Sequence, residues 1–132
     1  MKYFVGILTL GALFAVAPLL AHHSFAAEYD SKQPVKLTGA VTKVDWTNPH
    51  VYFFIDVKDP ETGRVANWSF EMAAPGALKN TGWTRNTLHT GDLVIVEGTR
   101  AKDGGLHGNA RSVTLASTGQ KLGAASSETK GN

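Results

Sequence analysis

The chain has 132 residues and no cysteine, so we expect one domain that neither a disulfide nor a lipid-bearing cysteine can hold. Its formal net charge is +2, and loss of Lys2 with a signal peptide would lower it to +1. This near-neutral balance offers no electrostatic attraction for nucleic acid or anionic lipid. We therefore expect no nucleic-acid partner, and no membrane partner for the processed chain.

The first 21 residues have the organisation of a cleavable secretory signal. A basic residue precedes an apolar run over residues 4–17, and the segment ends in the small residue Ala21. A membrane-spanning helix needs about 20 apolar residues, whereas this segment contains Pro18 and is followed at once by His22 and His23. We predict that residues 1–21 are removed on export, which places the protein in the periplasm or outside the cell. A second small-x-small site, ending at Ala26, competes for cleavage.

The remaining chain divides into an arm over residues 22–34, a β-domain over 35–116 and a flexible polar tail over 117–132. The arm should end in a turn, because turn-forming residues precede Pro34. Strands are predicted where apolar residues alternate or run together. They cover residues 35–46, 50–57, 66–70, 92–98 and 109–115. The first strand should bend near residues 39–43, where its apolar positions change from odd to even.

The connection between the third and fourth predicted strands should contain a short helix. Pro75 suits a first helical position and Gly82 a C-terminal stop, which predicts a helix over residues 75–80. Three strands, a helix and two strands, with a long and bent first strand, is the plan of the OB-fold, a five-stranded, partly open barrel. We predict this all-β class, and another small barrel or sandwich of five or six strands is the alternative.

Several short motifs resemble those of a family of exported bacterial proteins that is known only as a domain of unknown function. They are Ala21-His-His-Ser-Phe25, Trp46-Thr-Asn-Pro-His50, Pro75-Gly-Ala-Leu78, Gly82-Trp-Thr-Arg85, Gly91-Asp92 and Ala101-Lys-Asp-Gly104. Together they span almost all of the chain that follows the signal. The resemblance implies an exported, compact β-domain and assigns no activity to any residue.

The residue that signal cleavage would expose carries the most specific chemical signal. Cleavage after Ala21 makes His22 the first residue, and an N-terminal histidine offers both its amine and its ring Nδ1 to one metal ion. A second imidazole would complete a T-shaped site, and imidazole-type nitrogen ligands in planar geometry suit Cu(II). The α-amine has a pKa of about 8, so copper needs to displace only one readily lost proton at neutral pH.

We expect His50 to supply the second imidazole, because Pro49 stiffens its approach and the acidic Asp56 on the same strand face could orient its ring. The other imidazoles are His23, His89 and His107. If cleavage follows Ala26 instead, both N-terminal histidines are lost. The alternative interpretation is that these histidines belong to a soluble, frayed end and that His50 only closes a turn.

The second predicted strand offers a different binding surface. Its residues Tyr52, Phe54 and Asp56 lie opposite its apolar face, where OB-folds bind oligosaccharides, oligonucleotides or peptides. Arg85, in the long connection, is free to pair with a carboxylate. Because the basic groove that nucleic acid needs is missing, a saccharide, a peptide or a partner protein is the expected ligand. Alternatively, Tyr52 and Phe54 pack under the helix or the arm.

The sequence therefore favours a non-enzymatic exported binding or accessory protein that binds copper through His22 and His50, with no other cofactor. A structural or interaction module that uses the strand face is the alternative, and a copper-dependent oxidoreductase is the third hypothesis. The three tryptophans, Trp46, Trp68 and Trp83, are interpreted as core residues rather than ligand-binding ones.

Overall fold

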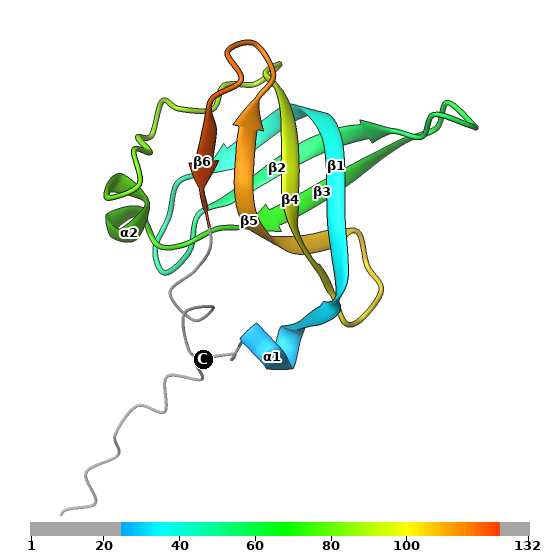
Figure 1. Cartoon of the computed structure of the whole chain (residues 1–132), viewed down its shortest axis with the longest axis horizontal. Coiled ribbons are helices and arrows are strands. Elements are labelled where there is room, and N and C mark those ends of the chain that lie inside the picture. The colour runs from blue at the N-terminus through cyan, green and yellow to red at the C-terminus, as the bar shows by residue number, and fades with distance from the viewer. Residues whose placement is uncertain (1–24, 125–132) are drawn as a thin grey trace, which may run out of the picture.

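Six strands and two short helices make up residues 25–124, which are the part of the chain that the computed structural model describes (Figure 1). In chain order they are α1 (Phe25–Glu28), β1 (Tyr29–Asp45), β2 (Tyr52–Lys58), β3 (Val65–Glu71), α2 (Pro75–Lys79), β4 (Leu93–Ala101), β5 (His107–Leu115) and β6 (Lys121–Gly123). The predicted signal peptide, His22, His23 and residues 125–132 lie outside the described residues. Neither of the two helices is long and apolar enough to cross a membrane.

Five of the strands close into a ring, which confirms the predicted OB-like plan. β1 pairs antiparallel with both β2 and β4, β2 pairs with β3, and β4 pairs with β5. A parallel pairing of β3 with β5 completes the ring, while β6 adds a sixth strand beside the second half of β5 (Figure 1). The predicted helix is present as α2 between β3 and β4, with Pro75 as its first residue.

β1 serves both sides of the barrel because it bends. Its later part pairs with β2 and its earlier part with β4. The register of the β1–β2 pairing shifts between Val41 and Lys43, so Thr42 is an extra residue that forms a bulge. This confirms the predicted bend. Gly39 lies so close to β2 that a Cβ there would come within 2.5 Å of the carbonyl oxygen of Asp56, which explains the glycine at this crossing.

The alternating apolar residues of the strands fill the interior of the barrel. Phe53 of β2 and Phe70 of β3 are fully buried and stack with ring centroids 5.6 Å apart. Trp68 continues this stack, and Trp83 is buried with its indole Nε1 donating to the carbonyl of Gly123 at 2.8 Å. Trp46 packs against the same core from its edge. All three tryptophans therefore contribute to packing, as interpreted from the sequence.

β1 begins earlier than predicted and includes the segment that was expected to form a turn. Its ladder with β4 is irregular between Tyr29 and Pro34. Within that irregularity the side chain of Asp30 accepts hydrogen bonds from the backbone of Lys32 at 3.0 Å and the side chain of Gln33 at 2.9 Å. The predicted turn-type hydrogen bonds are thus present, but they lie in an irregular part of a strand that continues on either side, where residues 30–33 stand opposite Arg100.

Residues 117–124, which were predicted to begin a flexible tail, contain the strand β6 instead. β6 pairs with β5, and its Leu122 is only 8% exposed because it packs in the main core. Ala124 is buried as well, and its backbone bonds to both Ala73 and Arg111. Leu122 has no apolar neighbours along the sequence, but it is buried because β6 pairs with β5 and brings it to the core. The sequence analysis did not predict this.

Candidate functional site

Three polar side chains converge on the carboxylate of Glu71, the last residue of β3. The phenol of Tyr29 donates to Oε2 at 2.7 Å, and the phenol of Tyr52 donates to the same oxygen at 3.2 Å. Nδ1 of His50 lies 3.3 Å from Oε1. Glu71 is only 7% exposed, and a carboxylate this buried requires such partners. We call Tyr29, His50, Tyr52 and Glu71 the Glu71 cluster.

The strand ladder explains why two members of the cluster meet. Tyr52 and Glu71 are directly opposite each other in the antiparallel β2–β3 pair, so their side chains leave the same face of the sheet. Phe53 and Phe70, their neighbours along the two strands, point into the core. Because side chains alternate along a strand, Tyr52 and Glu71 point away from the barrel interior.

His50 is held by the turn that precedes β2. The hydroxyl of Thr47 donates to the carbonyl of His50 at 3.2 Å, and Val51 exchanges backbone hydrogen bonds with Met72 and Ala73 just beyond the end of β3. These bonds continue the β2–β3 ladder past its last paired residues. They bring the imidazole of His50 beside Glu71.

A hydrogen bond at Nδ1 determines the tautomer of His50. Nδ1 lies 3.1 Å from the carbonyl oxygen of Met72 and 3.3 Å from the carboxylate of Glu71. A carbonyl oxygen can only accept, so Nδ1 carries the proton and donates it to Met72, with the carboxylate of Glu71 as a nearby charge. In the neutral ring, Nε2 then presents its lone pair, and among residues 25–124 it has no hydrogen-bond partner. The His50 side chain is 24% exposed, so the ring is accessible in part.

The two phenols of the cluster remain protonated donors over the physiological pH range. Burial, together with the nearby charge of Glu71 and its hydrogen bond, raises the pKa of Tyr52 to about 12. Burial and the shorter hydrogen bond to Glu71 hold the pKa of Tyr29 still further above its ordinary value. Both phenols therefore act as hydrogen-bond donors to the carboxylate of Glu71.

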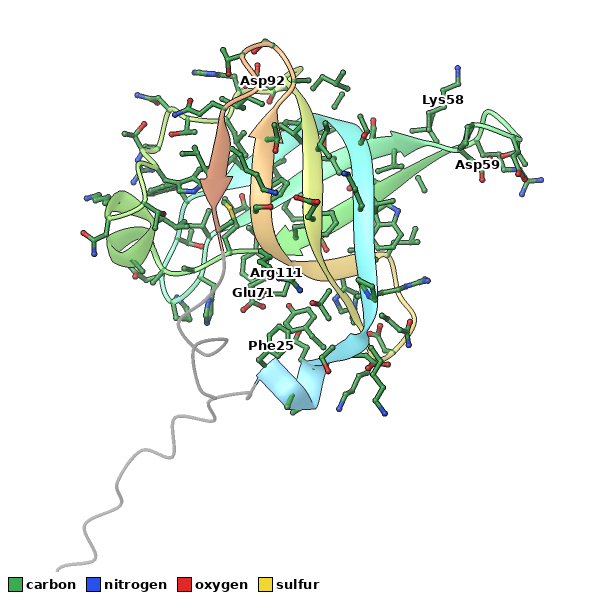
Figure 2. The ribbon with its side chains drawn as sticks, in the orientation of Figure 1. Phe25, Lys58, Asp59, Glu71, Asp92 and Arg111 are labelled. Carbon is green, nitrogen blue, oxygen red and sulfur yellow. The ribbon has the colours of Figure 1, made fainter. Side chains whose placement is uncertain are left out.

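The N-terminal helix is attached to the Glu71 cluster. The ring of Phe25 lies against that of Tyr29, with centroids 5.3 Å apart. Lys102 follows β4, and its backbone N–H donates to the carbonyl of Glu28 at 2.9 Å while its ammonium donates to the carbonyl of Ala26. Figure 2 shows Phe25 at the same end of the barrel as Glu71. A series of direct contacts thus connects α1 to His50.

The two other described histidines have different surroundings. His89 is exposed, and its backbone N–H donates to Asp92, which lies at the end of the barrel opposite Glu71 (Figure 2). His107 has its Nε2 2.9 Å from Asp103, and this hydrogen bond lowers the pKa of the Asp103 carboxyl. Among residues 25–124, no group of three His, Cys, Asp or Glu side chains could hold a metal ion.

The predicted ligand face of β2 is largely engaged in contacts of its own. Tyr52 is part of the Glu71 cluster, and Phe54 is half-buried with the ammonium of Lys43 5.3 Å from its ring centroid. Asp56 is exposed and accepts a hydrogen bond from Asn67 at 2.9 Å. The three residues alternate along β2 and so share one face of the strand.

Two residues predicted to contribute to these sites lie elsewhere. Asp56 was expected to orient His50, but it follows His50 by six residues, which is roughly 20 Å along an extended chain. The carboxylate beside His50 is Glu71, which the sequence analysis missed. Arg85 is exposed on the connection from α2 to β4, so it is not part of β2, whose face was predicted to bind a ligand.

A buried polar atom without a partner lies next to the cluster. Asn109 is the register partner of Glu71 in the parallel β3–β5 pair, so the two side chains lie on the same face. Its amide Nδ2 is buried and has no hydrogen-bond partner among the described residues. An unpaired buried donor is unusual in a native structure and costs about 1–3 kcal/mol.

Comparisons with known proteins agree with the fold and assign no activity. The profile of a family described as "Family of unknown function (DUF6152)" matches residues 12–111. No curated protein matches the chain. The fold is similar to the crystal structure of the mitochondrial single-stranded DNA-binding protein Rim1 from S. cerevisiae, with a TM-score of 0.51 and 13% identity over 64% of this chain and 93% of that chain. At this identity the likeness shows the OB-like fold alone.

Proposed function

We propose that this chain, which belongs to the family of unknown function DUF6152, is an exported, non-enzymatic accessory protein that binds one copper ion. After signal cleavage His22 would supply its α-amine and ring Nδ1, and His50 would supply its ring Nε2. The observation that carries the proposal is the setting of Nδ1 of His50, which donates to the carbonyl of Met72 and lies 3.3 Å from the carboxylate of Glu71.

This arrangement of His50 is the one that metal-binding histidines generally have. Such a histidine donates its second ring N–H to a carboxylate or a backbone carbonyl, which fixes the tautomer and makes the other nitrogen a better ligand. Here both kinds of acceptor are present, and the two phenols in turn hold the carboxylate of Glu71 in place. Amine and imidazole nitrogens favour copper over hard cations such as Mg²⁺ or Ca²⁺.

The attachment of α1 supports the participation of the N-terminus. Only three residues of chain lead from His22 to Phe25, and they can span at most about 10 Å. Phe25 itself packs on Tyr29, whose phenol is bonded to Glu71. The α-amine of His22 is therefore tethered by a short segment to the cluster that contains His50.

The same contacts bear on where the signal is cleaved. Cleavage after Ala26 would remove Phe25 and Ala26, and with them the contact to Tyr29 and the acceptor of the Lys102 ammonium. Cleavage after Ala21 keeps both. Retention of these contacts favours a mature chain that starts at His22, which is the form that the copper proposal requires.

The test uses the full-length chain, exported and processed by a bacterial host. Mass spectrometry gives the mature N-terminus, and calorimetric titration with Cu(II) compares the wild type with His22→Ala, His50→Ala, His23→Ala and His89→Ala. We expect one copper per chain. We expect His22→Ala and His50→Ala each to weaken binding by more than the ~10–100-fold that loss of an outer hydrogen-bond partner costs. His89→Ala should bind normally, because this exposed histidine lies at the opposite end of the barrel.

Three results would overturn the proposal. The first is a mature chain that starts at Ala27. The second is an affinity that is unchanged in both His22→Ala and His50→Ala. The third is a loss of binding in His23→Ala with none in His50→Ala, because that pattern means that the N-terminal peptide alone chelates the metal.

A further inference from the structure

One edge of strand β3 is open near the loop that joins it to β2. β3 pairs with β2 over its whole length, from Val65 to Glu71, but β5 pairs with its other edge only from Ser69 to Glu71. Figure 1 shows the β2–β3 loop extending away from the barrel, and Figure 2 places Lys58 and Asp59 at this tip. Among residues 25–124, no strand pairs with the outer edge of residues 65–67.

The backbone hydrogen bonds at both ends of β3 show which of its residues bond to β2. The carbonyl of Arg64 accepts from the N–H of Asp59 at 2.8 Å, and the N–H of Met72 donates to the carbonyl of Val51 at 2.8 Å. Residues that exchange bonds with the partner strand alternate with residues that do not. The even-numbered residues of β3 therefore bond to β2.

The odd-numbered residues of β3 bond in the opposite direction. The N–H of Ser69 donates to the carbonyl of Leu106 at 3.1 Å, on the side away from β2. By the same alternation, the N–H and carbonyl groups of Val65 and Asn67 point to the open edge. This edge thus offers four backbone groups in a row, and it ends where Leu106 occupies Ser69.

The open edge lacks the features by which folded proteins usually prevent strand edges from pairing. Those features are charged side chains, prolines and covering segments. On β6, by contrast, the carbonyl of Gly123 accepts from the indole of Trp83 at 2.8 Å and from the hydroxyl of Thr81 at 3.1 Å. Residues 65–67 include no charge and no proline, and the apolar side chain of Val65 is 61% exposed.

We propose that this edge pairs antiparallel with the same edge of a second copy of the chain, about a two-fold axis at Ala66. Val65 of each copy then lies opposite Asn67 of the other, and their outward groups form four backbone hydrogen bonds. The two β2–β3 hairpins become one four-stranded sheet. A register that is shifted along the strand would leave some of these groups unpaired, because Leu106 already occupies Ser69.

A second copy fits this edge better than a flexible peptide does. A flexible segment must lose conformational entropy at each residue before it pairs, and only a few bonds are available here to offset that cost. The β3 strand of a second copy is already ordered, because β2 pairs with all seven of its residues. Since the paired segment is short, we expect a weak, reversible dimer.

The first test is sedimentation equilibrium of the processed chain, from micromolar to millimolar concentration, with a chelator present so that the result is independent of copper. Val65→Pro removes the outward N–H at the first residue of β3, a position where a strand tolerates proline. By symmetry it deletes two of the four bonds, so the dissociation constant should rise about tenfold or more. Val65→Thr keeps the N–H and the branched shape, and it should dimerise nearly as well as the wild type.

The second test locates the symmetry axis with a cysteine, which the chain otherwise lacks. In the proposed register the two copies of residue 66 form a pair without hydrogen bonds, with Cα atoms about 4.5 Å apart, a separation that a disulfide can bridge. Ala66→Cys should therefore become mainly a disulfide-linked dimer in a glutathione buffer. Val65→Cys is the control, because the two copies of residue 65 lie diagonally and more than about 7 Å apart. It should stay mainly monomeric although Val65 is more exposed than Ala66.

Three results would overturn the proposed dimer. The first is a wild-type chain that stays monomeric at millimolar concentration. The second is a dimer whose affinity is unchanged in Val65→Pro, or weakened equally in Val65→Thr, because the backbone edge would then not be the interface. The third is disulfide formation in Val65→Cys that equals that in Ala66→Cys. Circular dichroism checks that Val65→Pro is folded, and the small change in Ala66→Cys decides the matter if it is not.

Discussion

The phenol of Tyr29 and the carboxylate of Glu71, 42 residues apart in the sequence, share a hydrogen bond of 2.7 Å. This bond joins the start of β1 to the end of β3 and connects the N-terminal helix with the carboxylate that orients His50. Both side chains are almost fully buried. Its effects on the free energy of unfolding and on Cu(II) binding can therefore be measured separately.

Tyr29→Phe should lower the free energy of unfolding by about 1.5–3 kcal/mol, the range for a hydrogen bond to a charged group. The reason is that Glu71 stays buried and loses its shortest hydrogen bond. Urea denaturation measures the change. Tyr52→Phe is the matched control, and its loss should be smaller because its bond is 3.2 Å long and its side chain is less buried. Equal losses in the two variants would contradict this ranking.

Glu71→Gln should weaken Cu(II) binding by about 10–100-fold while His50 remains in place. The amide keeps the size of the carboxylate, and the bond from Nδ1 to the Met72 carbonyl is untouched, but the negative charge that strengthens the imidazole as a ligand is gone. Glu97→Gln is the control, since that carboxylate is bonded to Lys121 and Ser112 on β6 and β5. An affinity as high as that of the wild type in Glu71→Gln would show that Glu71 does not act on the metal.

Tyr52 should ionise with a pKa of about 12 in the folded protein, against about 10 in the unfolded chain. The folded state holds this proton more tightly, so its contribution to stability is complete below pH 10 and is lost as the pH rises from about 10 to 12. Absorbance at the tyrosinate band gives the ionisation, and urea denaturation at each pH gives the stability. Tyr52→Phe should remove this step, and a Tyr52 that ionises near pH 10 in the native state would refute the prediction.

Asn109→Leu should raise the free energy of unfolding by about 1–3 kcal/mol, because it replaces a buried donor that has no partner by an apolar group of similar size. Asn109→Asp is the control, and it should be destabilising because a second carboxylate would face Glu71 across the β3–β5 pair. Thermal or urea unfolding measures both. A marked loss of stability in Asn109→Leu would mean that the amide has a partner in solution, such as a buried water.

The sequence alone predicted the elements that depend on a local pattern, such as alternating apolar residues or a helix-starting proline. The parity change near Gly39 predicted the bulge at Thr42, and Pro75 predicted the start of α2. The order of strands and helix then predicted the OB-like plan, because few arrangements accommodate a long first strand that bends. Local patterns failed at Leu122, whose burial depends on where the chain returns and not on its neighbours in sequence.

The candidate site was predictable only in part, because its contacts are not local. His50 and Tyr52 were identified from their position and alternation, but Glu71 had no distinguishing motif. Its role depends on the register of the β2–β3 hairpin and on contact with a residue 42 positions earlier. Asp56 was predicted to orient His50 because the two residues and Tyr52 share the parity of one strand face. Six residues separate Asp56 from His50, however, so they lie far apart along the extended strand.

The most direct test of the account is the effect of one equivalent of Cu(II) on the amide NMR spectrum of the processed chain. Paramagnetic copper broadens the resonances of nearby nuclei, so the site can be located along the sequence. The account predicts that resonances of residues 50–51 and 71–73 disappear while those of residues 89–92, at the opposite end of the barrel, remain. Broadening that spares residues 50–51 and 71–73, or that appears only around His89 or His107, would contradict it.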